Sequence, residues 1–244
     1  MTATHGPAID WAQLRNRPLS RDEKRQVRAF YSDGYHDKWK YTARHPWLRI
    51  IGEFRAELTR TVFPHIGKVL DGGCAGGEEI LAFRRLGIET WGFDMAPDLH
   101  EFVYSEAAPF VRIGPMDAIP FAASDGFTTF VSHDVFEHVP IDALQRLPHE
   151  LVRLGITQVA CIISADTESP GHITIQDTAW YERLFAAAGF RMLHEITTIL
   201  DDVITPAGWD EQRQLPICIP YTQSGRPRNG WNRVPGHCFF RRES

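Results

Sequence analysis

A glycine-rich turn between Asp71 and Glu79 carries the clearest chemical signal in this sequence of 244 residues. The turn follows the apolar pair Val69-Leu70 and reads DGGCAGGEE, so a short strand leads through glycines into a helix. Glycines lack a Cβ atom and adopt positive φ angles, which lets a ligand approach the backbone closely. Asp94, at the end of the next apolar run, can accept hydrogen bonds from both hydroxyls of a ribose. The sequence therefore predicts a ligand site where these two strands end.

Three kinds of glycine-rich turn have to be distinguished. The dinucleotide pattern GxGxxG fails in both registers, because Cys74 or Ala75 stands where its second glycine belongs. The phosphate-binding loop requires Gly-Lys-Ser/Thr, which this turn lacks. The pattern acid-x-Gly-x-Gly-x-Gly fits, with Ala75 in place of the middle glycine, and its leading acid binds a cationic amine. Asp71 therefore favours a ligand with an ammonium group over one held by its phosphates.

The elements that must position these residues alternate regularly from Lys68 onward. The segment QVACIIS at 158–164 is a continuous apolar run, which is typical of a central parallel strand. Strands that alternate with helices predict a parallel sheet with helices on both faces. We expect strands over 69–70, 88–93, 110–113, 127–131, 158–164, 190–200 and 238–240. We expect one helix that begins at residue 46 and further helices over 78–85, 97–107, 136–154 (broken near Pro140 and Pro148) and 177–189.

Two parts of the chain lie outside this alternation. Ser20 and Glu23 have the spacing of a capping box, which predicts the start of a helix near the N-terminus. A connection as long as 201–236 is typical of a lid or a binding loop. We therefore expect a helical extension over 1–65 and a single domain over 66–244 that carries the insertion 201–236 on its substrate side.

Composition narrows the class of function. Lys and Arg number 26 and Asp and Glu number 31, and the net charge of −5 makes nucleic acid and anionic membranes poor partners. No run approaches the roughly 18 apolar residues of a membrane span, and the N-terminal residues lack the apolar core of a secretory signal. The four cysteines are widely spaced, which argues against a zinc or disulfide framework and fits a reducing compartment. We expect a cytoplasmic protein, a monomer or a homodimer, with no nucleic-acid or membrane partner.

Five motifs between residues 67 and 192 resemble those of the class I S-adenosylmethionine-dependent methyltransferases. They are most similar to the branch that includes the C-methyltransferases of ubiquinone and menaquinone biosynthesis and many small-molecule methyltransferases. In chain order the motifs are VLDGGCAGG, WGFD, MDAIPF, DGFTTFVSHDVFEHV and AAAGF. The resemblance implies a Rossmann-like, mostly parallel sheet of seven strands in the order 3-2-1-4-5-7-6, with the last strand antiparallel and helices on both faces.

The resemblance also implies the cofactor, S-adenosylmethionine, and its product, S-adenosylhomocysteine. The residues that would hold the methionine part of the cofactor are Asp71, Gly72, Gly73, Ala75 and Gly77. Asp94 would bind the ribose hydroxyls and Met95 would lie against the adenine. Asp117 and the amide of Ala118 would face the adenine amino group.

Ser132 and His133, at the end of the fourth strand, would border the methyl group that is transferred. Methyl transfer is an in-line displacement at a carbon activated by positive sulfur, so the protein mainly aligns the reactants. A hydroxyl nucleophile also benefits from a general base, and His133 is the candidate because histidine titrates near neutral pH. The alternative for His133 is a polar lining residue without proton transfer. The run HDVFEH at 133–138 matches neither HExxH nor HxxEH, so we expect no metal.

Aromatic and imidazole side chains supply the candidates for substrate contact. These are Tyr31, Tyr35, Tyr41, His138, His172, Trp209, Tyr221 and Trp231. We expect methyl transfer to an oxygen or nitrogen atom of a small molecule, such as a biosynthetic or natural-product intermediate. Two alternatives stay open: a glycan, lipid-linked or RNA acceptor, and a module that binds the cofactor without methylating anything.

Overall fold

The computed structural model of the chain describes residues 9–32, 35, 46–196, 204–210, 212–213, 215–220 and 236–243. Within these ranges, the large sheet has seven strands in the order β3-β2-β1-β4-β5-β9-β6. They are β1 (Lys68–Gly72), β2 (Thr90–Asp94), β3 (Val111–Ile113), β4 (Phe127–His133), β5 (Gln158–Ile163), β6 (Phe190–Met192) and β9 (Gly236–Arg242). Neighbours from β3 to β5 run parallel, whereas β9 pairs antiparallel with both β5 and β6. With β9 as the seventh strand of the sheet, the order and direction predicted from the sequence are confirmed.

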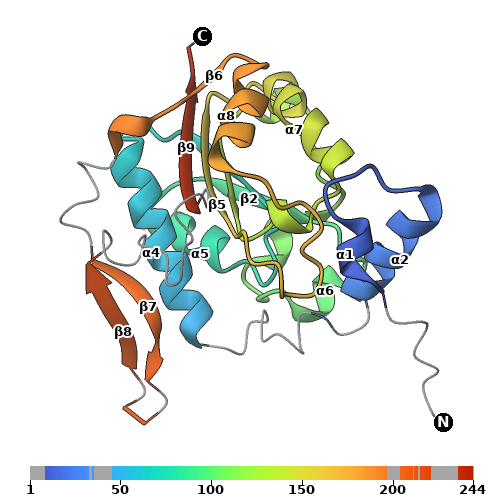
Figure 1. Cartoon of the computed structure of the whole chain (residues 1–244). Coiled ribbons are helices and arrows are strands. Elements are labelled where there is room, and N and C mark those ends of the chain that lie inside the picture. The colour runs from blue at the N-terminus through green and yellow to red at the C-terminus, as the bar shows by residue number, and fades with distance from the viewer. Residues whose placement is uncertain are drawn as a thin grey trace.

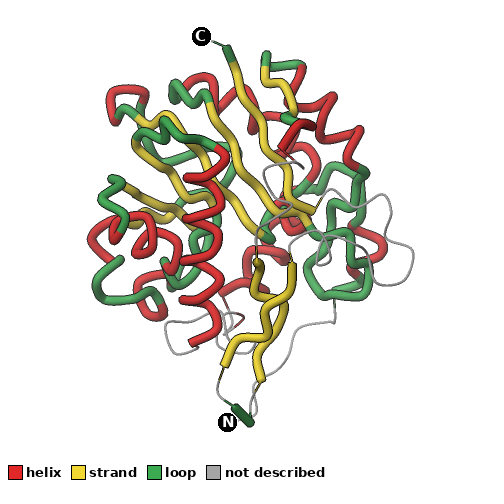
Figure 2. Tube along the Cα trace, turned by 90° about the vertical axis from the view of Figure 1, so that its left-hand side faces the viewer, coloured by secondary structure: helices red, strands yellow, loops and turns green. Residues whose placement is uncertain are grey.

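Helices cover both faces of this sheet (Figures 1 and 2). They are α1 (Trp11–Leu14), α2 (Arg21–Ser32), α4 (Pro46–Val62), α5 (Glu78–Arg85), α6 (Leu99–Phe102), α7 (Ile141–Arg153) and α8 (Thr178–Ala186), with 3₁₀ turns η1 (Ala108–Phe110), η2 (Ala123–Asp125), η3 (Phe136–His138) and η4 (His194–Ile196). Successive strand residues point to opposite faces, so Val69 packs with α4 and α5 while Leu70 packs with α7 and α8. The core is therefore two apolar layers, one on each side of the sheet.

Two helix starts follow directly from capping chemistry. The amide of Glu23 donates to Ser20 Oγ at 3.3 Å, and the amide of Ser20 donates to Glu23 Oε2 at 2.7 Å. These are the two reciprocal bonds of a capping box, so α2 begins where the sequence predicts. Asp177 Oδ1 accepts from the Trp180 amide at 2.7 Å and caps α8 in the same way.

Two predicted helices differ in extent from the observed ones. The helix expected over 97–107 is only α6, because the Tyr104 amide leaves the helical path and donates to the Gly76 carbonyl at 2.9 Å. The break expected at Pro148 is absent from α7. Leu147 and Leu151 on either side of that proline are fully buried, and their packing holds the helix together although Pro148 lacks an amide donor.

The strand expected over 190–200 is also shorter than predicted. β6 ends at Met192, and the Leu193 amide makes one further bond to the Phe239 carbonyl at 2.8 Å. The chain then turns into η4, because Leu193 and Ile196 are buried in the apolar layer under α4. Residues 197–200 lie outside the described ranges.

The segment between β6 and β9 contains a separate two-stranded ribbon. β7 (Ile204–Asp210) pairs antiparallel with β8 (Leu215–Pro220). The ribbon extends away from the large sheet at the lower left of Figure 1, and β7 contacts α4. Among the helices in the described part of the chain, none has the length and hydrophobicity needed to cross a membrane.

Candidate functional site

A cavity of about 510 Å³ lies where the carboxyl ends of β1, β2 and β4 meet. This is the edge at which open α/β sheets bind their ligands. One side is formed by strand ends and the glycine-rich turn, and the other by α2, α4 and Tyr35. The predicted site residues that line the cavity are Tyr31, Tyr35, Asp71, Gly73, Ala75, Asp94, Met95, His133 and His138. Nine predicted residues from distant parts of the sequence are thus brought together.

The glycine-rich turn leaves β1 in a conformation that favours glycine. Gly73 has a φ of +78°, and a Cβ atom at this position would lie 2.5 Å from Val135 Cγ2. Its amide donates to the Phe93 carbonyl at 2.8 Å, which ties the turn to β2. Ala75 also has a positive φ, +41°, although it carries a Cβ atom. The turn is therefore tight, close to its neighbours and accessible from the cavity.

Asp94 joins the ends of β1 and β2. Its Oδ2 accepts from the Ala75 amide at 3.2 Å and its Oδ1 accepts from the Ala96 amide at 2.9 Å. The side chain is buried yet lines the cavity. The carboxylate is thus held in one orientation at the ligand edge of the sheet.

Acidic side chains crowd the β1 side of the cavity. Burial, with the nearby charges of Glu79 and Glu78, raises the pKa of Asp71 well above its ordinary value. Burial raises the pKa of Glu78 to about 7, and Glu79 adds to that increase. Glu78 Oε1 is buried without a hydrogen-bond partner among the described residues. This wall of the cavity would therefore be stabilised by a ligand with positive charge.

His133 belongs to a buried network of charged groups. Its Nδ1 lies 2.8 Å from both carboxylate oxygens of Glu79, and Arg55 Nη1 lies 3.3 Å from Glu79 Oε1. Arg55 also forms an ion pair with Asp134. Burial alone raises the pKa of Glu79, but His133 and Arg55 more than offset it, and the net pKa is lowered.

The tautomer of His133 follows from this network. Because an ionised carboxylate only accepts hydrogen bonds, Nδ1 of His133 carries the hydrogen and donates it to Glu79. In the neutral ring, the basic lone pair is then on Nε2.

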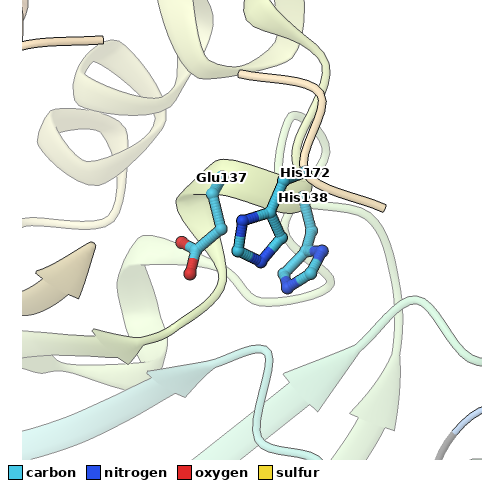
Figure 3. Close-up of side chains that lie close together, drawn as sticks. All are labelled: Glu137, His138 and His172. Carbon is cyan, nitrogen blue, oxygen red and sulfur yellow. The ribbon is translucent and has the colours of Figure 1, made fainter. Parts of the chain in front are cut away.

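A second polar cluster adjoins the cavity at η3 (Figure 3). The side chains of Glu137, His138 and His172 converge, with ligand-type atoms within 4.8 Å of one another. Tyr31 Oη lies 2.9 Å from His138 Nδ1, and His172 Nδ1 donates to the Asp166 carbonyl at 2.6 Å. Burial raises the pKa of Glu137 well above its ordinary value, with a further contribution from the nearby charge of Asp134.

Comparison with known proteins identifies the chemistry of this sheet edge. Residues 70–163, from β1 to the end of β5, match the family described as a methyltransferase domain. The strand order of the large sheet and this match agree with the fold of class I S-adenosylmethionine-dependent methyltransferases. No curated protein sequence matches the chain.

Solved methyltransferases share the fold at low sequence identity. Magnesium protoporphyrin IX methyltransferase from Synechocystis PCC 6803, with bound S-adenosylhomocysteine, superimposes with a TM-score of 0.60 at 13% identity, covering 91% of this chain and 100% of that one. The 1,6-didemethyltoxoflavin-N1-methyltransferase of Burkholderia thailandensis gives 0.57 at 14% identity, covering 94% and 93%. A TehB-like methyltransferase from Corynebacterium glutamicum gives 0.52 at 16% identity, covering 88% and 100%. At these identities the likeness establishes the fold.

The match to a methyltransferase domain implies S-adenosylmethionine as the cofactor. The cavity fits it in charge, because Asp71 and the unpartnered Glu78 Oε1 offer acceptors to a cationic ligand. Asp94 offers a fixed carboxylate beside the turn. Glu78 and Glu79, in the two positions after the last glycine of the turn, were missed by sequence reasoning. Their only sequence signal is two acids at the start of a helix, which is an ordinary helix feature.

Three of the predicted cofactor residues of the methyltransferase domain shape the turn without lining the cavity. Ser132 is buried and its Oγ donates to the Gly72 carbonyl at 2.8 Å. A Cβ atom at Gly72 would lie 2.5 Å from the Phe130 ring. Gly77 precedes α5 with a φ of +84°, and a Cβ atom there would meet Ala107 at 2.7 Å. These residues hold the turn in place by close contact.

Asp117 and Ala118 lie outside the cavity lining of the described chain. The Asp117 carboxylate forms an ion pair with Arg146 of α7, and Ala118 is exposed. Gly114 and Met116 line the cavity from the same loop instead. Contact of Asp117 and Ala118 with the adenine stays a prediction.

The remaining predicted substrate contacts divide into two groups. His172 is buried behind His138, with ring centroids 4.6 Å apart, and is absent from the described cavity lining. Tyr41, Tyr221 and Trp231 lie outside the described residues, and of Trp209 only the backbone, in β7, is described.

Proposed function

We propose that the domain transfers the methyl group of S-adenosylmethionine to an oxygen or nitrogen atom of a small molecule. The observation that carries this proposal is the cavity itself, in which α2 and α4 cover the sheet edge. Its volume, about 510 Å³, lies within the range of roughly 300–1,000 Å³ found for small-molecule sites. A space of this size that also admits the cofactor favours a compact acceptor.

The cover over the cavity is aromatic and apolar. Tyr31 and Tyr35 face it from the N-terminal segment, and Trp47, Leu48 and Ile51 face it from α4. Such surfaces bury flat or apolar molecules while a few polar groups fix their orientation. Two structural neighbours, the protoporphyrin and toxoflavin methyltransferases, are also named for small-molecule substrates. We therefore assign residues 1–65 as a helical cover and 66–244 as the methyltransferase domain, with the insertion 201–236 beside it.

We assign the cofactor contacts to the β1 and β2 ends. Asp71, Gly73 and Ala75 would hold the methionine part, Asp94 the ribose and Met95 the adenine. When bound, the cofactor supplies an electrophilic methyl group on positive sulfur. The fixed carboxylates and the turn then align that group with the acceptor, which is a proximity effect.

We assign His133 as the general base and Glu79 as the residue that positions it. Glu79 holds the Nδ1 hydrogen, so Nε2 of His133 is left to receive a proton from the acceptor. His133 and the Arg55 guanidinium together lower the pKa of Glu79, so the carboxylate stays ionised and maintains this tautomer. This role applies to a hydroxyl acceptor, since a neutral amine has less need of a base.

Calorimetric titration tests the cofactor assignment. S-adenosylhomocysteine should bind the wild type, and Asp94→Ala should weaken binding at least about tenfold, because each hydrogen bond to a charged group contributes roughly 1.5–3 kcal/mol. Glu101→Gln, which removes an exposed acid from nearby α6, is the matched control and should bind like the wild type. Equal affinities for Asp94→Ala and the control would contradict the assignment.

Transfer of a labelled methyl group tests the acceptor class. The wild type is incubated with methyl-labelled cofactor and, in separate reactions, with a small-molecule extract, total RNA and a lipid extract. We expect label in the small-molecule fraction. Label in RNA or lipid would refute a small-molecule acceptor.

A further inference from the structure

We propose that a divalent first-row transition-metal ion binds Glu137, His138 and His172, at the edge of the cofactor cavity. The three side chains come from η3 and from the loop after β5, and their ligand-type atoms lie within 4.8 Å of one another (Figure 3). Two imidazoles and one carboxylate suit ions such as Zn²⁺ or Fe²⁺. The ion-binding part of the proposal is independent of the proposed function, whereas its catalytic role rests on it.

Glu137 supplies the first argument. Its side chain is completely buried, with a relative exposure of 0%. Oε1 accepts from the Ser164 amide at 3.2 Å, but Oε2 is buried with no hydrogen-bond partner within the described ranges. Buried polar atoms in folded proteins are nearly always satisfied. The Oε2 atom therefore calls for a ligand.

The two imidazoles supply the second argument, because each is oriented by an outer partner. His172 Nδ1 donates to the Asp166 carbonyl at 2.6 Å, which leaves the lone pair on Nε2. The His138 ring is oriented by Tyr31: its Nδ1 lies 2.9 Å from the Tyr31 hydroxyl, which itself lies 3.4 Å from the Gly171 carbonyl. Metal-binding histidines characteristically use their second nitrogen in this way.

The backbone fixes the positions of the three side chains. The amides of Ile173 and Thr174 both donate to the Glu137 carbonyl, at 2.8 and 3.0 Å. Thr174 Oγ1 donates to the Val139 carbonyl at 2.7 Å. The loop that carries His172 is thus bound directly to η3, and the group is held together before any ion arrives.

The location of the group gives the ion a role in catalysis. His138 lines the cavity. The neighbouring Val135 lies against the glycine-rich turn, since a Cβ atom at Gly73 would contact its side chain. Three protein ligands leave coordination positions open, as in catalytic zinc sites. An acceptor hydroxyl that reaches an open position becomes more acidic.

The proposed step transfers the methyl group to oxygen. The acceptor hydroxyl gives its proton to Nε2 of His133, the base assigned above. A bond forms between the acceptor oxygen and the methyl carbon as the carbon–sulfur bond breaks. Its electron pair stays on sulfur, and S-adenosylhomocysteine leaves. Of the two acceptor atoms in the proposed function, the ion therefore selects oxygen.

The run 133–138 by itself predicts no metal site. Two of the three ligands lie in that run, but the third, His172, is contributed by a separate loop. The spacing HxxxEH thus contains only part of the group.

Zinc binding to the chelator-stripped protein tests the site. Calorimetry with ZnCl₂ should show one equivalent bound to the wild type, and His172→Gln should weaken binding by at least about tenfold, the lower limit found even for outer-shell changes. His149→Gln removes an exposed histidine from α7 and is the matched control. Circular dichroism verifies that each variant is folded. A wild type that binds zinc no more tightly than His172→Gln would overturn the proposal.

Histidine-selective ¹⁵N NMR of the wild type keeps the test valid if His172→Gln does not fold. Stoichiometric Zn²⁺ should shift the ring signals of His138 and His172 and leave His149 unchanged. A shift of His149 without the other two would overturn the site.

Titration of S-adenosylhomocysteine in the presence of a chelator separates the two proposals. Cofactor binding that persists without zinc binding refutes only the metal site, whereas zinc binding without cofactor binding refutes only the methyltransferase assignment of the cavity.

Discussion

Replacement of Glu78 by glutamine should flatten the pH dependence of stability of the cofactor-free protein. The pKa of Glu78 rises from 4.5 to about 7, chiefly because its carboxyl group is buried at the cavity wall. Between these values the folded protein binds more protons at this site than the unfolded chain does. Stability from this group is therefore fully present below pH 4.5 and is lost as the pH rises through about 7.

The size of the effect follows from the same two pKa values. From about pH 5.5 to about pH 8, ionisation of Glu78 should lower the free energy of unfolding by about 2 kcal/mol. The glutamine side chain of the Glu78→Gln variant does not ionise and keeps nearly the same shape, so the substitution removes this contribution. Urea unfolding of both proteins at both pH values measures this contribution. It is the change in the free energy of unfolding between pH 5.5 and pH 8 in the wild type, minus the same change in Glu78→Gln.

The exposed acid Glu101 provides the control for this experiment. Glu101→Gln should keep the wild-type pH dependence. Identical slopes for the wild type and Glu78→Gln would refute the argument that the buried, unpartnered carboxyl raises its own pKa. Saturating S-adenosylmethionine provides a second check, because a cation beside Glu78 should stabilise its ionised form and reduce the wild-type slope.

Three further substitutions test the elements that hold the site. Gly73→Ala should lower the free energy of unfolding by about 2–4 kcal/mol, because φ is positive at this position and the new Cβ atom would contact Val135. A decrease of less than about 1 kcal/mol in urea unfolding would contradict this. Glu79→Gln should cost about 3–5 kcal/mol at neutral pH because Arg55 loses a buried partner. Since the pKa of Glu79 is lowered, ionisation of this group stabilises the fold, and the wild type loses this contribution as the pH falls below 4.5. The variant should therefore show less acid destabilisation in urea unfolding. Ser20→Ala should cost about 1 kcal/mol in a thermal melt through loss of the capping box, and an unchanged melting temperature would show that the cap contributes nothing.

The strand order and the turn could be predicted because both depend on local patterns. Gly73 and Gly77 stand where φ is positive and neighbours approach closely, and both glycines are visible in the sequence. Alternation of apolar runs with helical periodicity likewise indicates the sheet. Element ends were less predictable, as β6 shows, because Leu193 is drawn into the layer under α4 by tertiary packing.

The buried charges could not be predicted, because burial depends on what covers a residue. The spacing of apolar residues in α4 places Arg55 off the apolar face, where side chains are usually solvated. In the structure Arg55 instead forms an ion pair with Glu79 in the interior. Asp117 stands in a motif-like position, but it forms an ion pair with Arg146 of α7 and is not among the described residues that line the cavity. Neither contact leaves a signal in local sequence.

The sequence by itself determined the sheet, its ligand edge and the chemistry of the turn, because these follow from residue types at short spacing. Only the tertiary structure decided which groups share an environment. It placed Glu79 on His133, and it joined His172 to Glu137 and His138 from a separate loop. Hydrogen bonding, desolvation and charge interactions act over a few ångströms in space, so they are set by segments that folding brings together and not by their order along the chain.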